Sequence, residues 1–187
     1  MNITKAIWYI MTLLTKWKYG KVGRRSYVGP SIFIQRPERL FIGSDVRIYP
    51  GMRAEMTKKK ARIFIGDNVS IGQNFHVVSY DRELHIGSNT TISANVFISN
   101  VNHDYHVIDV HSLDQEMIVK DTVIGEYCFV GYGAVILPGT RLGRQCIVGA
   151  NSVVIGEFPD YCVIAGNPAR IIRKYSQQTK KWEKVNR

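Results

Sequence analysis

The sequence predicts an all-β solenoid, in which short strands stack side by side and a turn follows every six residues. Two observations predict it: branched aliphatic residues recur at steps of six, and glycine often follows them. Glycine fills the position after the aliphatic residue at eight of 14 steps, although the chain holds only 16 glycines. A six-residue period suits neither an α-helix nor a simple β alternation, whereas three such units close a triangular coil of about 18 residues. The aliphatic steps are Ile42, Ile48, Ile65, Ile71, Val77, Ile86, Ile92, Ile98, Ile124, Val130, Ile136, Leu142, Val148 and Val154.

The first element is a predicted helix within residues 1–21. Its sequence from Ile3 to Lys18 contains no Gly or Pro, and Ile3, Ile7, Ile10 and Leu14 share one face. We expect this helix to pack on the open edge of the first coil. The alternative is that it lies on an anionic membrane, with its aromatic residues inserted and its lysines on lipid phosphates.

The solenoid itself is assigned to residues 22–169. The glycine after each aliphatic residue is expected to ease the backbone through the corner. Interruptions of the six-residue frame at 49–64, 78–85 and 99–123 predict loops that leave the coil. The last is the longest, and we assign an insertion to 104–122, whose few apolar side chains are expected to pack on a neighbouring subunit. Residues 170–187 are predicted to form a basic tail, helical or extended.

Composition limits the class and the compartment of the protein. A chain of 187 residues is long enough for one domain with a core. Three cysteines argue against a disulfide scaffold and fit a reducing compartment. The apolar stretch near the N-terminus resembles neither a membrane span nor a secretory signal. We therefore expect a cytoplasmic protein, with a peripheral position at the inner face of the membrane as the alternative.

Charge is concentrated at the two ends of the chain. Residues 1–37 hold seven Lys or Arg and no acid, and residues 170–187 hold seven Lys or Arg and one acid, whereas the middle is slightly acidic. A nucleic-acid-binding protein usually carries its positive charge on the folded recognition surface, so we expect no nucleic acid as partner. Basic ends fit an anionic cofactor or a membrane surface better.

Together with the ending VIAGNPARIIR at residues 163–173, the repeats resemble the hexapeptide-repeat acyltransferases, which are left-handed parallel β-helices. The resemblance covers about residues 22–174 and is closest to the sugar and xenobiotic O-acetyltransferases. It implies transfer of an acetyl group from acetyl-CoA to a hydroxyl of a sugar or lipid-linked sugar, in surface-polysaccharide biosynthesis. It also implies a homotrimer with a site at each interface. N-acetyl transfer to an amino sugar is an alternative.

His103 is the candidate catalytic residue. It follows Ile98, the end of a regular run, at the place where the coil gives way to the long insertion. Transfer to a hydroxyl requires a base near neutral pH, which an imidazole provides, and the resemblance assigns that role to His103. Asn102, Asp104 or a loop carbonyl could hold the other ring nitrogen. We expect Asp81, Asn102 and Asp104 to contact the acceptor.

The resemblance also implies the cofactor contacts. Tyr132, Gly133, Ala150 and Asn151 match positions that contact the pantetheine arm of CoA. Arg170 and Arg173 match basic positions near the adenosine phosphates, to which the planar guanidinium is suited.

The alternative interpretation is that the histidines bind a metal ion. The gamma-class carbonic anhydrases share the fold and use three histidines, and here His76, His103 and His106 or His111 would be the candidates. Because two of these three would lie in the insertion, we expect no metal, and we expect His76 and His85 to be outward residues on strands. A scaffold without catalysis is the third reading.

The three cysteines are assigned to structure. Cys128 and Cys146 stand one coil apart and are expected to stack inward, whereas Cys162 falls outside the frame. No activated Ser or Cys is visible, which favours direct transfer without an acyl-enzyme.

Overall fold

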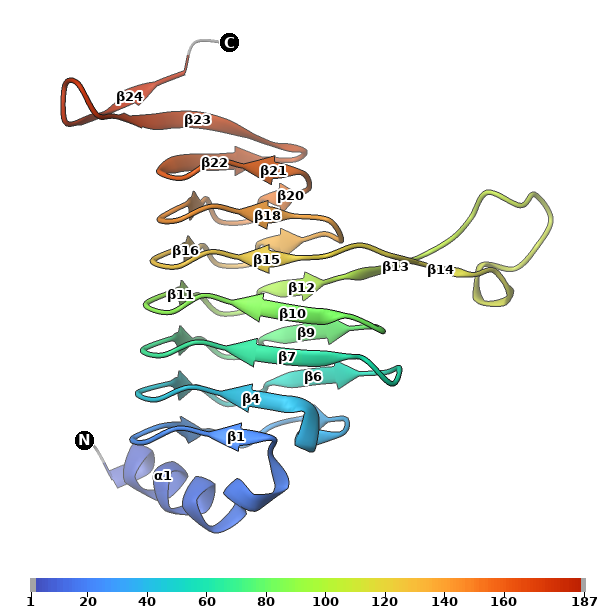
Figure 1. Ribbon diagram of the computed structural model, residues 1–187, viewed down its shortest axis with the longest axis vertical. Helices are drawn as coiled ribbons and strands as arrows, with labels where there is room; N and C mark the ends of the chain where they lie inside the picture. Colours follow the sequence, from blue (N-terminus) through green and yellow to red (C-terminus); the bar gives the residue numbers. More distant parts are fainter. Residues whose placement is uncertain (1–2, 186–187) are drawn as a thin grey trace.

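The computed structural model describes residues 3–185, which form a parallel β-solenoid (Figure 1). Coils of three short strands stack along one long axis. Three sheets, here called A, B and C, run the length of the stack as its faces, and each corner is named after the two sheets that it joins. The predicted solenoid is confirmed.

Sheet A contains seven parallel strands. Equivalent residues of successive coils face each other, as Ile42 faces Ile65 and Ile65 faces Ile86. In stacking order the strands are β1 (Lys21–Val22), β4 (Leu40–Ile42), β7 (Arg62–Ile65), β10 (Glu83–Ile86), β15 (Val123–Ile124), β18 (Arg141–Leu142) and β21 (Glu157–Phe158).

Sheet B follows sheet A in each coil. Its strands are β2 (Tyr27–Val28), β5 (Arg47–Ile48), β8 (Ser70–Ile71), β11 (Thr91–Ile92), β16 (Phe129–Val130), β19 (Ile147–Val148), β22 (Cys162–Gly166), β23 (Ala169–Ser176) and β24 (Lys181–Lys184). The last two pair in antiparallel fashion and end the stack. The C-terminal tail is therefore extended, one of the two forms expected for it.

Sheet C closes each coil and has six parallel strands. They are β3 (Phe33–Ile34), β6 (Arg53–Met56), β9 (His76–Ser79), β12 (Phe97–Ser99), β17 (Val135–Ile136) and β20 (Val153–Val154). Short 3₁₀ helices, η2 (Pro37–Arg39) and η3 (Ser112–Asp114), lie in the connections from sheet C back to sheet A.

The predicted aliphatic residues form the core of the stack. All 14 are buried, and none exceeds 3% exposure. Each side chain covers its equivalent in the coil below, so the coils share one continuous hydrophobic core. Burial of apolar surface at about 25 cal/mol per Å² is therefore what holds successive coils together.

The glycines after the aliphatic residues serve close packing between coils. At Gly87 φ is not positive, but a Cβ would lie 2.5 Å from the backbone carbon of Gly125 in the next coil. The left-handed residue of this corner comes two positions later, at Asn89 with φ of 60°. Asparagine tolerates that conformation, and here Asn68 Nδ2 donates to Asn89 Oδ1 at 3.0 Å. The expectation that glycine eases the turn was wrong, because the constraint on it is steric.

Two of the three predicted loops belong to the coil. The interruption at 49–64 contains β6 and most of β7, and that at 78–85 contains the end of β9 and most of β10. In β6 the side chains alternate, with Ala54 and Met56 buried. Four-residue strands therefore shift the six-residue frame without leaving the coil. Apart from the corner at 49–52 between β5 and β6, only 57–61 and 80–82 remain as turns.

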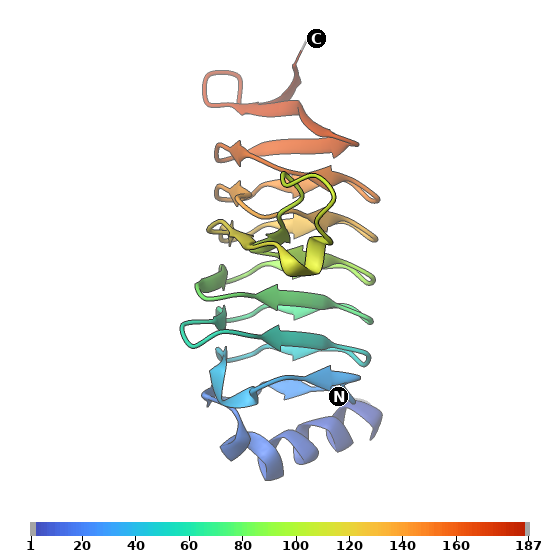
Figure 2. The same cartoon turned by 90° about the vertical axis from the view of Figure 1, so that its right-hand side faces the viewer.

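The third interruption does leave the stack. It forms an antiparallel hairpin of β13 (Val101–His103) and β14 (Met117–Val119), which projects sideways from the middle of the solenoid (Figures 1 and 2). The segment beyond it is exposed and includes Tyr105, Ile108 and Leu113, whose exposed fractions are 69%, 78% and 67%.

The N-terminal helix α1 (Ile3–Thr15) and the 3₁₀ turn η1 (Lys16–Lys18) lie beneath the first coil (Figure 1). Thr12 is buried against the coil, and Val28 N–H donates to Thr12 Oγ1 at 2.9 Å. This bond satisfies a backbone group of β2 near the end of the stack.

Candidate active site

The hairpin is anchored firmly at the C–A corner of the middle coil. Thr122 Oγ1 donates to the carbonyl oxygen of Ser99 at 2.9 Å, which ties the two ends of the insertion together. Lys120 N–H donates to the carbonyl oxygen of Asn100 at 2.9 Å. A rigid base of this kind fixes the direction in which β13 leaves the stack.

His103 is the last residue of β13 and faces Met117 of β14. Residues directly opposite in an antiparallel pair point to the same side, so His103 and Met117 share one face of the hairpin. Asn102 faces Ile118 and takes the other face. The structure therefore separates Asn102 from His103.

A hollow of about 530 Å³ lies against the hairpin and the 80–82 turn one coil below. Met117 and Val119 line it, which places it on the His103 face of the hairpin. Asp81 lines it from the turn, where φ is 50° and the carboxylate accepts from Lys60 N–H at 3.3 Å. The structure thus brings Asp81 to the side of the hairpin that carries His103.

Two charged residues that the sequence analysis did not single out also line this hollow, Arg82 and Glu116. Arg82 Nη1 donates to Asp121 Oδ1 at 2.9 Å, so the guanidinium is held beside the base of the hairpin. Neither residue belongs to a recognisable motif, because the hollow exists only once the insertion has folded against an earlier coil.

The His103 ring is partly enclosed by its surroundings. Its Nδ1 atom is fully buried and has no hydrogen-bond partner within residues 3–185. The Asn102 side chain does not reach the ring, because its Oδ1 accepts from the His103 backbone N–H at 3.0 Å. A buried polar atom without a hydrogen-bond partner lowers the stability of the folded state.

Asp104 is occupied by its own loop. Its Oδ1 accepts from the backbone N–H groups of Tyr105 at 2.7 Å and His106 at 3.0 Å, and it also contacts the His106 ring. The bond with the His106 ring, supported by these backbone donors, holds the pKa of Asp104 below its usual value. Asp104 therefore pairs with His106 and does not orient His103.

The residues matched to the pantetheine arm come together at the B–C corner. Tyr132 and Gly133 occupy one coil, and Ala150 and Asn151 occupy the next. Asn151 N–H donates to the carbonyl oxygen of Tyr132 at 2.8 Å. Gly133 has φ of 67°, and a Cβ there would lie 2.3 Å from Asn151 Oδ1. Glycine adopts this left-handed backbone without strain, and asparagine takes the equivalent position in the adjacent coils, at Asn95 and Asn151.

A β-bulge places Arg170 and Arg173 on the same face of sheet B. Arg170 pairs with Ala165 and Arg173 with Val163, and the register shifts between these pairs. Without the bulge, two residues three apart on a strand would point to opposite faces. Both arginines are exposed.

The two halves of the candidate site stand at different corners. The hairpin with His103 leaves the C–A corner, whereas the residues matched to the pantetheine arm lie at the B–C corner: Tyr132, Gly133, Ala150 and Asn151. Sheet C separates them by about 16 Å, since each face is about five residues wide at about 3.3 Å per residue. Within one chain the structure does not bring the proposed CoA contacts to His103.

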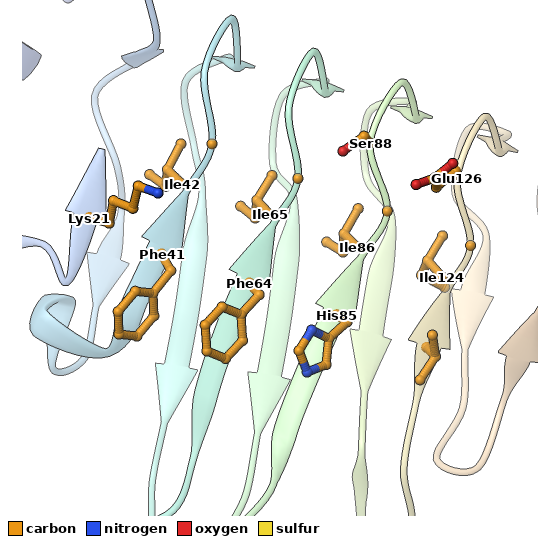
Figure 3. A pocket seen from close by; sticks show the side chains of 15 residues that line it. Lys21, Phe41, Ile42, Phe64, Ile65, His85, Ile86, Ser88, Ile124 and Glu126 are labelled. Atoms are coloured by element: carbon orange, nitrogen blue, oxygen red, sulfur yellow. The ribbon is translucent and has the colours of Figure 1, made fainter. Parts of the chain in front are cut away.

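A second hollow, of about 510 Å³, lies over sheet A (Figure 3). Phe41, Phe64 and His85 stack there on successive strands, with ring centroids 4.7 and 4.8 Å apart. Lys21 and Glu126 lie toward its two ends (Figure 3). The outward position predicted for His85 is confirmed, and this flat apolar surface is suited to packing.

The predicted outward position of His76 is also confirmed. Its Nε2 lies 3.0 Å from Glu55 Oε1, which also accepts from Arg53 Nε at 2.7 Å. Partial burial works against ionisation of Glu55, but the bonds from Arg53 and His76 bring its pKa below the usual value. Within residues 3–185, no three His, Cys, Asp or Glu side chains converge as metal ligands.

All three cysteines are buried, Cys162 included. Cys146 and Cys162 have their sulfur atoms 3.5 Å apart although they are separated by 16 residues. The expectation that Cys162 is out of frame was wrong, because the last coil is shorter than 18 residues. Its contact with Cys146 and its burial raise the pKa of the Cys162 thiol, which opposes a role as nucleophile.

Comparison with known proteins agrees with the repeat. Residues 121–156 match the family model for bacterial transferase hexapeptide (six repeats). The chain is 38% identical over 134 residues to the putative lipopolysaccharide biosynthesis O-acetyl transferase WbbJ of Escherichia coli, covering 66% of each protein. It is 34% identical over 122 residues to the E. coli galactoside O-acetyltransferase, covering 62% of this chain and 58% of that one. It thus spans less than two thirds of either relative.

The fold is shared with solved structures. The N-acyltransferase AntD of Bacillus cereus, solved as its D94A mutant with dTDP and coenzyme A, has a TM-score of 0.75 at 17% identity, covering 89% of this chain and 90% of AntD. A galactoside acetyltransferase in complex with coenzyme A has a TM-score of 0.66 at 23% identity, covering 100% of this chain and 82% of that one. At these identities the likeness concerns the fold.

A further relative covers enough of both chains to decide the family. It is the putative colanic acid biosynthesis acetyltransferase WcaF of E. coli, 30% identical over 141 residues, which cover 73% of this chain and 71% of WcaF. The same six-residue repeat forms every face of the stack described above. The chain therefore belongs to the family of hexapeptide-repeat acyltransferases.

Proposed function

We propose that this protein transfers an acetyl group from acetyl-CoA to a hydroxyl group of a sugar, in the synthesis of a surface polysaccharide. The observation that supports it best is the placement of His103 on a rigid hairpin, on the same face as Met117, which lines a hollow together with Asp81. The relatives named for sugar O-acetylation point to the same reaction. The three buried, unpaired thiols fit a reducing compartment, so we place the reaction in the cytoplasm.

In the proposed mechanism His103 is the general base. Its Nε2 takes the proton of the acceptor hydroxyl, and the hydroxyl oxygen attacks the carbonyl carbon of the thioester. The tetrahedral intermediate then collapses, the carbon–sulfur bond breaks, and the thiolate of CoA takes the proton from His103. Direct transfer fits the burial of Cys128, Cys146 and Cys162, none of which is placed as a nucleophile.

Arg170 and Arg173 are proposed to bind the phosphates of CoA, because the bulge in β23 sets both on one exposed face. Tyr132, Gly133, Ala150 and Asn151 would contact the pantetheine arm at the B–C corner. Asp81 is proposed to accept hydrogen bonds from the acceptor. Asn102 and Asp104 are less suited to that role, since Asn102 is on the other face and Asp104 is paired with His106.

A homotrimer would join the two halves of the site. One chain leaves about 16 Å between them. In a trimer the hairpin of one subunit would reach the B–C corner of the next, and its exposed Tyr105, Ile108 and Leu113 would be buried there.

The test is a screen of sugar acceptors with acetyl-CoA, in which release of the CoA thiol is recorded. Activity should appear with a hydroxyl acceptor, and the acetylated product should lose its acetyl group under mild alkali, as esters do. An alkali-stable product would assign N-acetyl transfer to an amino sugar. Bound zinc with activity lost on chelation, or no thiol release with any acceptor, would overturn the proposal.

A further inference from the structure

The helix α1 packs on the first coil with its more polar side and leaves its more apolar side exposed. Thr12 is 3% exposed, and its hydroxyl accepts from β2. The Trp8 ring lies 6.0 Å from that of Tyr27, and Lys5 Nζ lies 5.2 Å from the ring centroid of Tyr49. The contacts to the first coil thus use a hydroxyl, aromatic rings and a cation.

The opposite side of the helix is a stripe of apolar side chains that points away from the coils. We call it the outer stripe: Ile3, Ile7, Ile10, Leu14 and Trp17, which are 81%, 50%, 55%, 71% and 78% exposed. The spacing of three and four residues places the four members in α1 on one face, and Trp17 follows them in η1. Surface helices of globular proteins normally turn such a stripe to the core, so this one is built for a partner outside the coil.

The surroundings of the outer stripe are cationic. Residues 1–37 contain seven Lys or Arg and no acid. Lys16, Lys18 and Lys21 are exposed and make no ion pair within residues 3–185, whereas Arg25 is paired with Asp45 at 2.7 Å. A partner that fits here has an apolar interior and an anionic surface.

The length of α1 determines whether the helix could cross a membrane or only lie on its surface. With 13 residues, α1 is about 20 Å long, compared with about 30 Å for the hydrocarbon core of a bilayer. Within residues 3–185 no helix is long and apolar enough to cross a membrane. The helix lies across the end of the stack (Figures 1 and 2), so contact through the outer stripe would lay it flat.

We propose that α1 is an interfacial helix that docks the end of the solenoid on an anionic lipid bilayer. The outer stripe enters the boundary between headgroups and acyl chains, while Lys16 and Lys18 face the lipid phosphates. The coils then rise from the membrane, with the base of the hairpin about 14 Å above the first coil, since β12 is the fourth strand of sheet C at about 4.8 Å per strand.

The first experiment uses the full chain without any substrate. It measures cosedimentation with vesicles of phosphatidylcholine alone and with vesicles of phosphatidylcholine and phosphatidylglycerol. We expect binding to the anionic vesicles, weakened by added salt, and little binding to the neutral ones. No binding to the anionic vesicles would overturn the proposal and leave the proposed acetyl transfer untouched.

Two double variants then test whether binding depends on the outer stripe or on exposed apolar side chains anywhere on the protein. Ile7→Gln/Ile10→Gln should weaken binding to anionic vesicles about tenfold to a hundredfold. The control, Ile155→Gln/Ile172→Gln, changes two isoleucines of similar exposure, 49% and 37%, that lie after β20 and within β23, far from α1. It should bind as the wild type does. Equal losses in both variants would contradict the proposal.

A third variant tests the charge. Lys16→Gln/Lys18→Gln should lower the affinity for anionic vesicles about tenfold or more, at about 1 kcal/mol for each lysine near the surface. Sedimentation without vesicles detects the competing occupant, a second copy of the chain. A wild type whose assembly state depends on Ile7 and Ile10, and which ignores vesicles, would make the stripe a contact between copies.

Discussion

At the scale of single residues, the imidazole of His103 is the group on which the proposed chemistry depends. We predict that His103→Ala lowers kcat for acetyl transfer about 10²- to 10⁴-fold, because the acceptor hydroxyl loses its general base. The KM for acetyl-CoA should change little, since the proposed CoA contacts lie at another corner. Steady-state thiol release on the acceptor identified by the screen measures both constants.

His106 provides the control for that prediction within the same loop. It is exposed and paired with Asp104, so His106→Ala should keep near-normal turnover. Sedimentation and circular dichroism should show both variants folded as the wild type. Near-normal turnover of His103→Ala on the true acceptor would remove His103 from the mechanism.

Sequence reasoning placed His103 where the coil gives way to the insertion, and the structure shows it there. It could not name the partner of the ring. Asp104 is adjacent in sequence, yet its carboxylate turns to the N–H groups of the two residues that follow, as short acidic side chains often do in turns. The side chain that contacts the imidazole therefore depends on which hydrogen bonds to the nearby backbone compete for it, and the sequence alone does not reveal these bonds.

At the scale of elements, the hairpin can be shortened without touching its paired residues. We predict that replacing residues 104–116 by Asn-Gly keeps the pair between His103 and Met117 across a two-residue turn. The coils should remain folded, because β12 and β17 still pair. Acetyl transfer should be lost and the proposed trimer loosened, since the exposed apolar tip is gone.

Circular dichroism, sedimentation and thiol release on the same shortened protein check this prediction. Because His103 is retained, a loss of activity would report on the tip and not on the base. A shortened protein that stays trimeric and transfers acetyl groups at the wild-type rate would show that the tip takes no part in the site.

The bulged strand β23 carries the second element-scale prediction. Arg170→Gln/Arg173→Gln should raise the KM for acetyl-CoA and leave the acceptor KM nearly unchanged, because the two guanidinium groups are proposed to bind phosphates. Lys180→Gln/Lys181→Gln, which removes the same charge from the turn into β24, should have little effect.

Kinetics at several salt concentrations check the arginines further. Salt screens exposed charges, so it should weaken use of acetyl-CoA in the wild type more than in the arginine variant. Equal salt sensitivity of the two proteins would make these arginines ordinary surface charge.

Elements of the regular coils were predictable because one residue type recurs at one spacing. The strands within 49–64 and 78–85 were not predictable in this way. A strand that is longer by two residues keeps its alternation of inward and outward side chains, but it breaks the six-residue period on which the prediction relied. The antiparallel course of β23 and its bulge were also beyond the pattern, because the repeat ends before them.

For the whole molecule, stability resides in contacts between neighbouring coils. Leu84 is fully buried in β10 and faces Ile63 of the coil below. We predict that Leu84→Ala lowers the free energy of unfolding by about 2–5 kcal/mol, because it leaves a cavity in the stack. Urea unfolding followed by circular dichroism measures the change.

Thr91 is the control for Leu84, since it lies on the next strand, β11, but is exposed on sheet B. Thr91→Ala should change the free energy of unfolding by no more than about 0.5 kcal/mol. Equal destabilisation by the two substitutions would mean that the core contacts do not dominate.

The architecture of the whole molecule followed from the period alone, whereas its assembly and its acceptor did not. Phe41 and Phe64 form a flat apolar surface on sheet A, but no spacing in the sequence specifies what covers a flat surface. The acceptor is proposed to bind in the hollow beside the hairpin, whose shape depends on side chains far apart in the chain.

The two dissimilar ends of the stack have a consequence for how large this protein can grow. A pile of equivalent coils has no intrinsic length, because its last coil offers the same backbone groups as the one below, and molecules could join end to end into a filament. Here α1 covers one end, and at the other the chain reverses into β23 and β24, whose outer edge carries Lys181, Glu183 and Lys184. Charged side chains on an outer strand oppose further pairing. The protein therefore remains a particle of fixed height.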